Sequence, residues 1–175
     1  MAKASKTTVQ NEPVVPIKKS LFDRVAGYLD ANDWHYNAES GKGYFSMGCR
    51  IKEASVRVII DVFESDDWRR VMTFSIYPIF VSENRRPAVL EAINRMNHGL
   101  VYGNLEMDPA DGEIRFRTSV ESEVDISESM MERALNGNIA GADKHFAALM
   151  AVAFGGATPE GVKEIAIRPD NTTLQ

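Results

Sequence analysis

The stretch from Arg85 to Phe116, RRPAVLEAINRMNHGLVYGNLEMDPADGEIRF, decides how half of this 175-residue chain folds. Pro87 has no amide proton and fits only within the first turn of a helix, which makes Asn84 the predicted N-cap. Apolar residues at helical spacing extend that helix to Asn97, and two strands then flank the tight turn 109–112, PADG. A helix followed by a hairpin is typical of an α+β domain, and nothing in the stretch has the pattern of an active site.

The residues before this stretch predict a helix and four strands. Apolar residues recur at helical spacing from Ile17 to Leu29, and this first helix should end near Asn32. Four runs of alternating apolar and polar residues follow between positions 34 and 80, separated by short turns. Consecutive short strands of this kind are typical of an antiparallel meander.

The residues after Phe116 complete the second hairpin and predict a last helical region that begins beyond Asp125. Gly137 and Gly141 weaken the middle of that region, so it is either one kinked helix or two short ones. The predicted order is α-β-β-β-β-α-β-β-α. This is an α+β fold in which helices pack on one face of an antiparallel sheet.

The chain is long enough for one hydrophobic core, and we expect one domain with two flanking segments. Residues 1–15 are polar without periodicity and should form a flexible N-terminal arm, while residues 157–175 should form a mobile C-terminal tail. The α+β domain then spans residues 16–156. An apolar share of 44% and a charged share of 26% are those of a folded protein rather than a disordered one.

Charge and cysteine content exclude several classes of protein. The net charge is −5 at pH 7, and nine acidic residues between 106 and 132 would repel a phosphate backbone. Cys49 is the only cysteine, which excludes an intrachain disulfide and a zinc site built from cysteines. No apolar run has membrane-spanning length, and the first residues lack the apolar core of a secretory signal. We therefore expect a cytoplasmic protein that binds no membrane.

No pattern in the chain predicts catalysis or a cofactor. His35, His98 and His145 each lack a second ligand at metal-binding spacing, and Cys49 falls on the predicted core face, where burial raises the pKa of a thiol. The one dense carboxylate group consists of Asp61, Glu64, Asp66 and Asp67. It leaves open an enzyme that uses a hard cation, although a solvated turn is the favoured interpretation. We expect no catalytic residue, no metal site and no cofactor.

Asn97 lies on the predicted buried side of its helix. A buried amide must find hydrogen-bond partners or cost about 1–3 kcal/mol. We predict that its side chain fixes the turn from Gly99 to Gly103, which leads into the fifth strand.

The face of the sheet away from the helices, the outer face, is predicted to be unusually apolar. Five residues are assigned to it: Tyr44, Ile59, Phe63, Val71 and Tyr77. A monomer rarely leaves such a patch in water, so the pattern predicts a homodimer interface or a surface for a partner protein. The alternative is that the alternation shifts at a bulge and that some of these residues belong to the core.

Four arginines form the one basic cluster that the sequence predicts: Arg69, Arg70, Arg85 and Arg86. They could hold an acidic segment of a partner or a phosphate, and the alternative is that all four are solvated and screened by nearby acids. Together with the lysines of the arm, they leave open a regulator that acts on nucleic acid, directly or through a DNA-binding partner protein. Direct binding of nucleic acid is not the favoured interpretation.

The order of elements and the segment from Val81 to Arg117 resemble the bacterial YbjN family. The matching residues are Trp34-His35-Tyr36, Arg85-Arg86-Pro87, Asn94-Arg95-Met96-Asn97, 103–108 (GNLEMD) and 111–116 (DGEIRF). The resemblance covers roughly residues 17–155. It implies a fold like that of type III secretion chaperones, frequent dimerisation and a regulatory role, and it provides no catalytic residues. The predicted function is a non-enzymatic protein-binding module, chaperone-like or regulatory, that acts as a homodimer and captures a partner protein.

Overall fold

A computed structural model describes residues 19–162 and contains the predicted order of helices and strands. The elements are α1 (Leu21–Ala31), β1 (Asn37–Glu39), β2 (Tyr44–Arg50), β3 (Ser55–Glu64), β4 (Arg69–Phe80), α2 (Arg86–Asn97), β5 (Asn104–Met107), β6 (Glu113–Ser122) and α3 (Glu128–Ala153), with single turns of 3-10 helix at η1 (Ser40–Lys42), η2 (Glu83–Arg85) and η3 (Pro159–Gly161). The predicted arm, residues 1–15, lies outside the described residues. Of the predicted tail, 157–162 are described, and Val162 at their end is buried.

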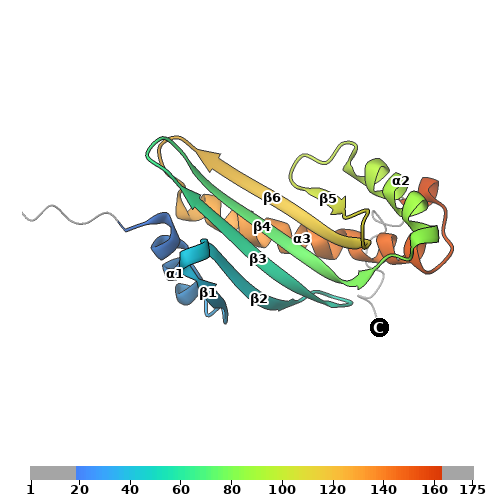
Figure 1. The fold of residues 1–175 in the computed structure, drawn as a ribbon, viewed down its shortest axis with the longest axis horizontal. Coiled ribbons are helices and arrows are strands. Elements are labelled where there is room, and N and C mark those ends of the chain that lie inside the picture. Colours follow the sequence, from blue (N-terminus) through green and yellow to red (C-terminus); the bar gives the residue numbers. More distant parts are fainter. Residues whose placement is uncertain (1–18, 163–175) are drawn as a thin grey trace, which may run out of the picture.

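The six strands form one sheet in the order β1-β2-β3-β4-β6-β5 (Figure 1). All five neighbouring pairs are antiparallel, which confirms the meander of the first four strands. The chain then leaves β4 through α2 and enters β5 at the edge of the sheet, and β6 returns beside β4. The edge strands β1 and β5 are only three and four residues long, and they pair with residues 44–46 of β2 and 114–117 of β6.

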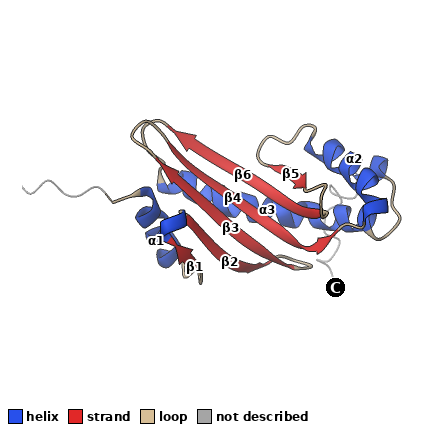
Figure 2. Ribbon diagram, in the orientation of Figure 1, coloured by secondary structure: helices blue, strands red, loops and turns tan. Residues whose placement is uncertain are grey.

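Helix α3 runs along one face of the sheet, which we call the inner face (Figure 2). It is one helix of 26 residues and not the two short helices that its glycines had left open. A Cβ atom added at Gly141 would collide with the ring of Phe116 on β6, and one at Gly137 would lie 3.0 Å from the ring of Tyr102. The glycines therefore let the helix approach the sheet closely, and this packing outweighs their weak helix propensity.

A buried amide joins α3 to the neighbouring strands β4 and β6. The Nδ2 of Asn138 donates to the carbonyl oxygens of Thr73, at 2.8 Å, and Phe116, at 3.0 Å. Its Oδ1 accepts from the Ser75 hydroxyl at 2.6 Å. Asn138 and Ser75 are both fully buried, so each hydrogen bond replaces one that water would otherwise make. The amide fixes the position of the helix on the sheet.

This amide explains why the alternation predicted for β4 is wrong. Val71, Thr73 and Ser75 face inward, paired in register with Val62, Ile60 and Val58 of β3. Tyr77 also lies in the core, where its hydroxyl donates to the carbonyl oxygen of Ala142 at 2.8 Å. The prediction that Val71 and Tyr77 belong to the outer face is therefore wrong: each is 2% exposed.

The physical reason is that the inner face of β4 is partly polar. Asn138 satisfies the hydroxyl of Ser75, so this polar residue is buried, and the apolar residues between the inward positions turn outward. Met72 and Phe74 lie on the outer face opposite Asp61 and Ile59 of β3.

Helix α2 begins at Arg86, with Pro87 in its first turn as predicted. The predicted N-cap at Asn84 is wrong, because the turn η2 extends over that position. The prediction for Asn97 is confirmed. Its Nδ2 donates to the Leu105 carbonyl at 2.9 Å and its Oδ1 accepts from the Leu105 amide at 2.8 Å, which fixes the start of β5 against the helix.

Candidate functional site

The outer face of the sheet is not covered by α1, α2 or α3 (Figure 1). The strand registers place its side chains in rows that cross the sheet from β2 to β6. The rows are Gly48-Arg57-Ile76-Arg115, Ser46-Ile59-Phe74-Arg117, Tyr44-Asp61-Met72-Ser119 and Phe63-Arg70-Glu121. Apolar side chains occupy the middle of this face, and charged side chains surround them.

Three of the five predicted interface residues lie on this face. Tyr44 and Ile59 are half-buried, and Phe63 is 41% exposed. Met72 and Phe74 take the places predicted for Val71 and Tyr77. A signal in the sequence could have identified them. The polar residues Thr73 and Ser75 alternate with Met72 and Phe74 on β4. In addition, Asn138 interrupts the apolar side of the last helix.

Two arginines lie over aromatic rings of the outer face and the adjoining turn. The guanidinium carbon of Arg115 lies 4.7 Å from the ring centroid of Phe74. That of Arg70 lies 5.7 Å from the ring of Phe63 and 5.4 Å from the ring of Trp68. These contacts place cations over aromatic rings, and both aromatic residues and arginine are enriched at protein interfaces.

The charges on the outer face balance one another. The ion pairs are Arg57–Glu113 at 3.8 Å, Arg70–Asp61 at 3.5 Å, Arg115–Glu106 at 2.8 Å and Arg117–Glu106 at 3.1 Å. Partial burial acts to raise the pKa of Glu106, but hydrogen bonds from Asn104 and Arg115 and the charges of Arg117 and Arg115 outweigh it, so the pKa lies below the ordinary carboxyl value. Each of these arginines already has a carboxylate partner, which weakens the attraction of this face for a phosphate backbone.

The predicted basic cluster is not a cluster in the structure. Arg69 and Arg70 begin β4, whereas Arg85 and Arg86 follow its far end, about 40 Å away for a strand of this length. Arg69 binds Glu64 and the carbonyl oxygen of Val124, both at 2.9 Å. The prediction that the four arginines act together is therefore wrong, because a twelve-residue strand separates the two pairs.

Arg85 and Arg86 instead hold the end of the fold around α2. Arg85 donates to the carbonyl oxygen of Val152 in the last turn of α3, where a cation suits the helix dipole. Arg86 donates to the carbonyl oxygens of Val81 at 3.1 Å and Pro109 at 3.0 Å, and so joins α2 to the β5–β6 turn. Both side chains are used for structure.

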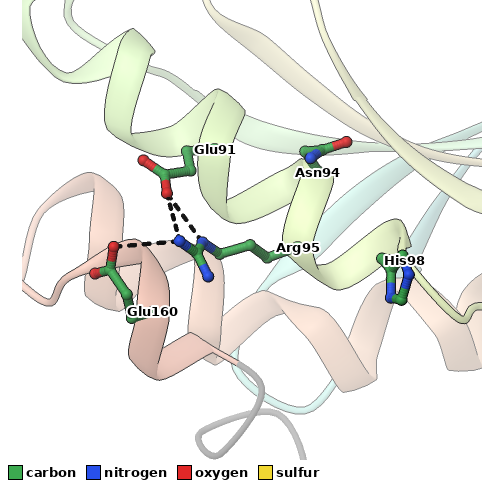
Figure 3. Close-up of a pocket in the computed structure, with 5 residues that line it drawn as sticks. All are labelled: Glu91, Asn94, Arg95, His98 and Glu160. Atoms are coloured by element: carbon green, nitrogen blue, oxygen red, sulfur yellow. Dashed lines mark hydrogen bonds and ion pairs between the residues drawn. The ribbon is translucent and has the colours of Figure 1, made fainter.

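A hollow of about 410 Å³ lies between α2 and η3 (Figure 3). The Nη2 of Arg95 points from α2 toward Glu91, at 2.7 Å, and Glu160 of η3, at 3.3 Å. Asn94 and His98 complete the lining, and His98 lies at the helix C-terminus as predicted. The ion pairs connect η3 to α2, and no lining side chain is deeply buried, so the geometry favours a structural role.

The remaining titratable candidates also have structural partners. The carboxylate of Glu64 accepts the Leu21 amide at 2.6 Å, at the start of α1, as well as binding Arg69. His145 is buried, with Nδ1 2.7 Å from the Gly141 carbonyl oxygen, and its burial lowers its pKa. Burial raises the pKa of the Cys49 thiol, as predicted. Within residues 19–162, no group of three or more histidine, cysteine or acidic side chains could hold a metal ion.

A second hollow, of about 490 Å³, lies on the outer face itself, beside Gly48 of β2. Arg57 and Ile76 line it, together with Phe80, which is 64% exposed. The pairing of β4 with β6 is irregular between Ile76 and Phe80, and a bulge of this kind redirects the side chains that follow it. The end of β4 therefore projects a large apolar side chain beside an empty space.

The described helices include none that is both apolar and long enough to span a bilayer. No curated protein matches the chain. The model of the family YbjN, described as "Putative bacterial sensory transduction regulator", matches residues 21–151, about three quarters of the sequence. This match includes every strand, α1, α2 and most of α3. The chain belongs to the YbjN family.

Proposed function

We propose that this chain is a non-enzymatic regulator that works by binding protein on the outer face of its sheet, forming a homodimer and capturing a partner protein. Members of the family are described as regulators, and this description supports a regulatory or protein-interaction role. The likeness to type III secretion chaperones stays a prediction.

The observation that supports the proposal is the apolar centre of the outer face. Ile59, Met72 and Phe74 adjoin one another on neighbouring strands and are only half-buried. Burying a fully exposed side chain of this kind contributes about 1.5–3 kcal/mol, and side chains that are already half-buried contribute correspondingly less, so several together support a transient interface. The paired arginines around them do not favour direct binding of nucleic acid, the second candidate function.

The test is the double variant Ile59→Glu/Phe63→Glu, with Leu90→Glu as the matched control. The exposed fraction of Leu90, 43%, is similar to that of Phe63, 41%. Leu90 lies on α2, away from the outer face. Tagged full-length chains would be compared for the proteins they retain from a cell extract and for their mass in solution.

We expect the double variant to lose retained proteins and mass, and Leu90→Glu to keep both. A double variant that is folded by circular dichroism and still matches the wild type in both measurements would refute the proposal.

A further inference from the structure

The last part of β6 lies at an edge of the sheet that β5 does not reach. β5 pairs with residues 114–117 of β6, and β6 continues through residues 118–122, which we call the open edge. Figure 1 shows β5 beside only the first part of β6. The exposure of the outward side chains changes at the same point, because Arg117 is half-buried whereas Ser119 and Glu121 are exposed.

The backbone of the open edge directs hydrogen-bonding groups away from the sheet. In an antiparallel pair, the N–H and C=O groups of successive residues point to opposite sides of the strand. The Asp108 amide donates to the Glu113 carbonyl oxygen at 2.9 Å, so the odd-numbered residues of β6 face the side of β5. On that side Ser119 and Glu121 each present an N–H and a C=O group, and within residues 19–162 no strand pairs with them.

The loop that follows β6 is held on the opposite side of the strand. Arg69 of β4 donates to the carbonyl oxygen of Val124 at 2.9 Å, and Arg24 of α1 donates to that of Ile126. These contacts direct the loop toward β4 and α1. Proline, lysine and bulges often block a sheet edge, and residues 118–122 contain none of them. The open edge therefore remains accessible to a further strand.

Apolar side chains on the inner side of the open edge are incompletely covered. Val120 is half-buried, whereas the inward residues before it on β6 are buried. The Thr118 hydroxyl donates to the Ala134 carbonyl oxygen of α3 at 2.8 Å, and Met130 lies one turn earlier on that helix. Met130 is also only partly buried. An apolar side chain on an added strand would cover these two residues.

The outer side of the open edge carries a negative charge without an ion-pair partner. Asp61 and Glu106 on the outer face pair with arginines, at 3.5 Å and 2.8 Å. The exposed carboxylate of Glu121 accepts from the Ser119 hydroxyl at 3.4 Å, and among the residues that the structure describes it has no arginine or lysine at ion-pair distance. A basic side chain on an added strand would pair with Glu121.

We propose that the open edge binds an extended segment of a partner protein, in which apolar and basic residues alternate, as an antiparallel strand in line with β5. The backbone of the segment bonds with Ser119 and Glu121, its apolar side chains cover Val120 and Met130, and its basic side chains face Glu121. Strand addition at a free edge is a general mode of peptide recognition. The inference rests on the proposed function in one respect, that the chain captures a protein, and it uses a surface other than the outer face.

The opposite edge of the sheet provides an internal control. β1 pairs with residues 44–46 of β2 only. The Ile51 amide donates to the Ala54 carbonyl oxygen in the β2–β3 turn, so the amides of Gly48 and Arg50 point away from β3. This edge carries the positive charge of Arg50, which repels a basic segment. We therefore expect such a segment to prefer the open edge of β6.

The first test uses a fluorescein-labelled peptide in which lysine and valine alternate, with a peptide of the same composition in scrambled order as its control. Fluorescence polarisation would measure binding to the full chain. In the proposed strand the lysines lie opposite Ser119 and Glu121 in hydrogen-bonded pairs, so their amides face β6. Methylating the lysine amides should weaken binding by at least about tenfold, and methylating the valine amides should have little effect. Equal effects, or equal binding of the scrambled peptide, would overturn strand addition.

The second test locates the added strand by hydrogen exchange. A saturating amount of the alternating peptide should slow exchange of the Ser119 and Glu121 amides by at least about tenfold and leave Gly48 and Arg50 unchanged. Slowing at Gly48 and Arg50 instead would place the peptide on the wrong edge. Slowing at Ser119 and Glu121 that follows protein concentration and not peptide would make a second copy the occupant. Either result would overturn the proposal.

The third test blocks the edge with proline. Ser119→Pro removes an edge amide without removing a hydrogen bond to β4, and Gly48→Pro makes the matched change at the opposite edge. We expect Ser119→Pro to weaken binding of the peptide by about tenfold and Gly48→Pro to leave it unchanged. Thermal unfolding of both variants would show that they are folded. Equal affinities for the two folded variants would contradict the proposal.

The fourth test reverses the charge and leaves the backbone unchanged. Glu121→Lys should weaken binding of the lysine–valine peptide by about threefold and favour a glutamate–valine peptide instead. Glu123→Lys makes the same change of charge just beyond the end of β6 and serves as the control. Equal effects of the two variants would indicate general attraction and overturn the role of Glu121. The proposed function would survive all these failures if Ile59→Glu/Phe63→Glu still loses retained protein.

Discussion

The two faces of the sheet use polar and apolar residues in opposite ways. On the inner face, Asn138 of α3 satisfies buried polar groups of β4 and β6, so polar residues lie inside. On the outer face, Met72 and Phe74 are only half-buried, and Arg115 lies over the ring of Phe74. The inner face packs against α3 of the same chain, whereas the outer face keeps partly exposed apolar side chains. Changes on the inner face should therefore affect stability, and changes on the outer face should affect association.

The largest expected effect is at the buried amide. Asn138→Ala removes the partners of Ser75 and of two carbonyl oxygens, and we expect a loss of about 2–4 kcal/mol in the free energy of unfolding. Urea denaturation would measure it, with Lys144→Ala, an exposed position on the same helix, as the control. A loss below that of the control would show that the amide does not fix α3 on the sheet.

Alanine substitutions at two glycines, one packed against the inner face and one on the outer face, test the difference between the two faces. Gly141→Ala places a methyl group against the ring of Phe116 and should destabilise the fold by roughly 1–3 kcal/mol. Gly48→Ala on the outer face meets no atom within 4 Å and should stabilise it by about 0.5–1 kcal/mol, because alanine has less backbone freedom to lose. Thermal unfolding of both variants would check the two signs, and equal signs would contradict the account of the two faces.

The order of helices and strands and the role of Asn97 could be predicted from the sequence, because both follow from local spacing. Asn97 contacts Leu105 only eight positions away. The alternation of β4 could not be predicted, because Asn138, 63 positions from Ser75, decides which side of the strand is polar. An alternation rule places the apolar Met72 and Phe74 inside, and so assigns Val71 and Tyr77, which alternate with them, to the wrong face.

The continuity of α3 was hidden for the same reason. Glycine is a weak helix former, so the sequence indicates a break at Gly141. In the structure, glycine is required there because a Cβ atom would collide with the ring of Phe116 on β6. The separation of Arg69 and Arg70 from Arg85 and Arg86 follows from the length of a single strand, which nearness in the sequence does not reveal.

A moderate loss of stability is expected when the predicted hydrogen bonds of Asn97 are removed. Asn97→Ala leaves the amide and carbonyl of Leu105 without partners and should cost about 1–2 kcal/mol. Urea denaturation would measure this loss, and dimerisation should not change, because the position lies away from the outer face. A variant that dimerises less while its stability is unchanged would contradict the separation of the two roles.

The smallest expected effect is the pH dependence of Glu106. Its folded pKa is lowered, so its contribution to stability is complete above the unfolded carboxyl value of about 4.3 and is lost as the pH falls through the lower folded value. Glu106→Gln should cost less than about 1 kcal/mol at pH 7, since the pairs with Arg115 and Arg117 are partly exposed. The difference from the wild type should shrink with acidification below pH 4.3, and a difference that grows there would contradict the sign.

The most direct measurement for the uncovered sheet face is the solution mass of the full chain beside that of Phe74→Glu. Light scattering of the wild type should rise with concentration toward twice the chain mass of 19.5 kDa. Phe74→Glu should stay at 19.5 kDa with an unfolding midpoint close to the wild type. Equal masses for the two proteins at every concentration would contradict the claim that this face binds a second copy.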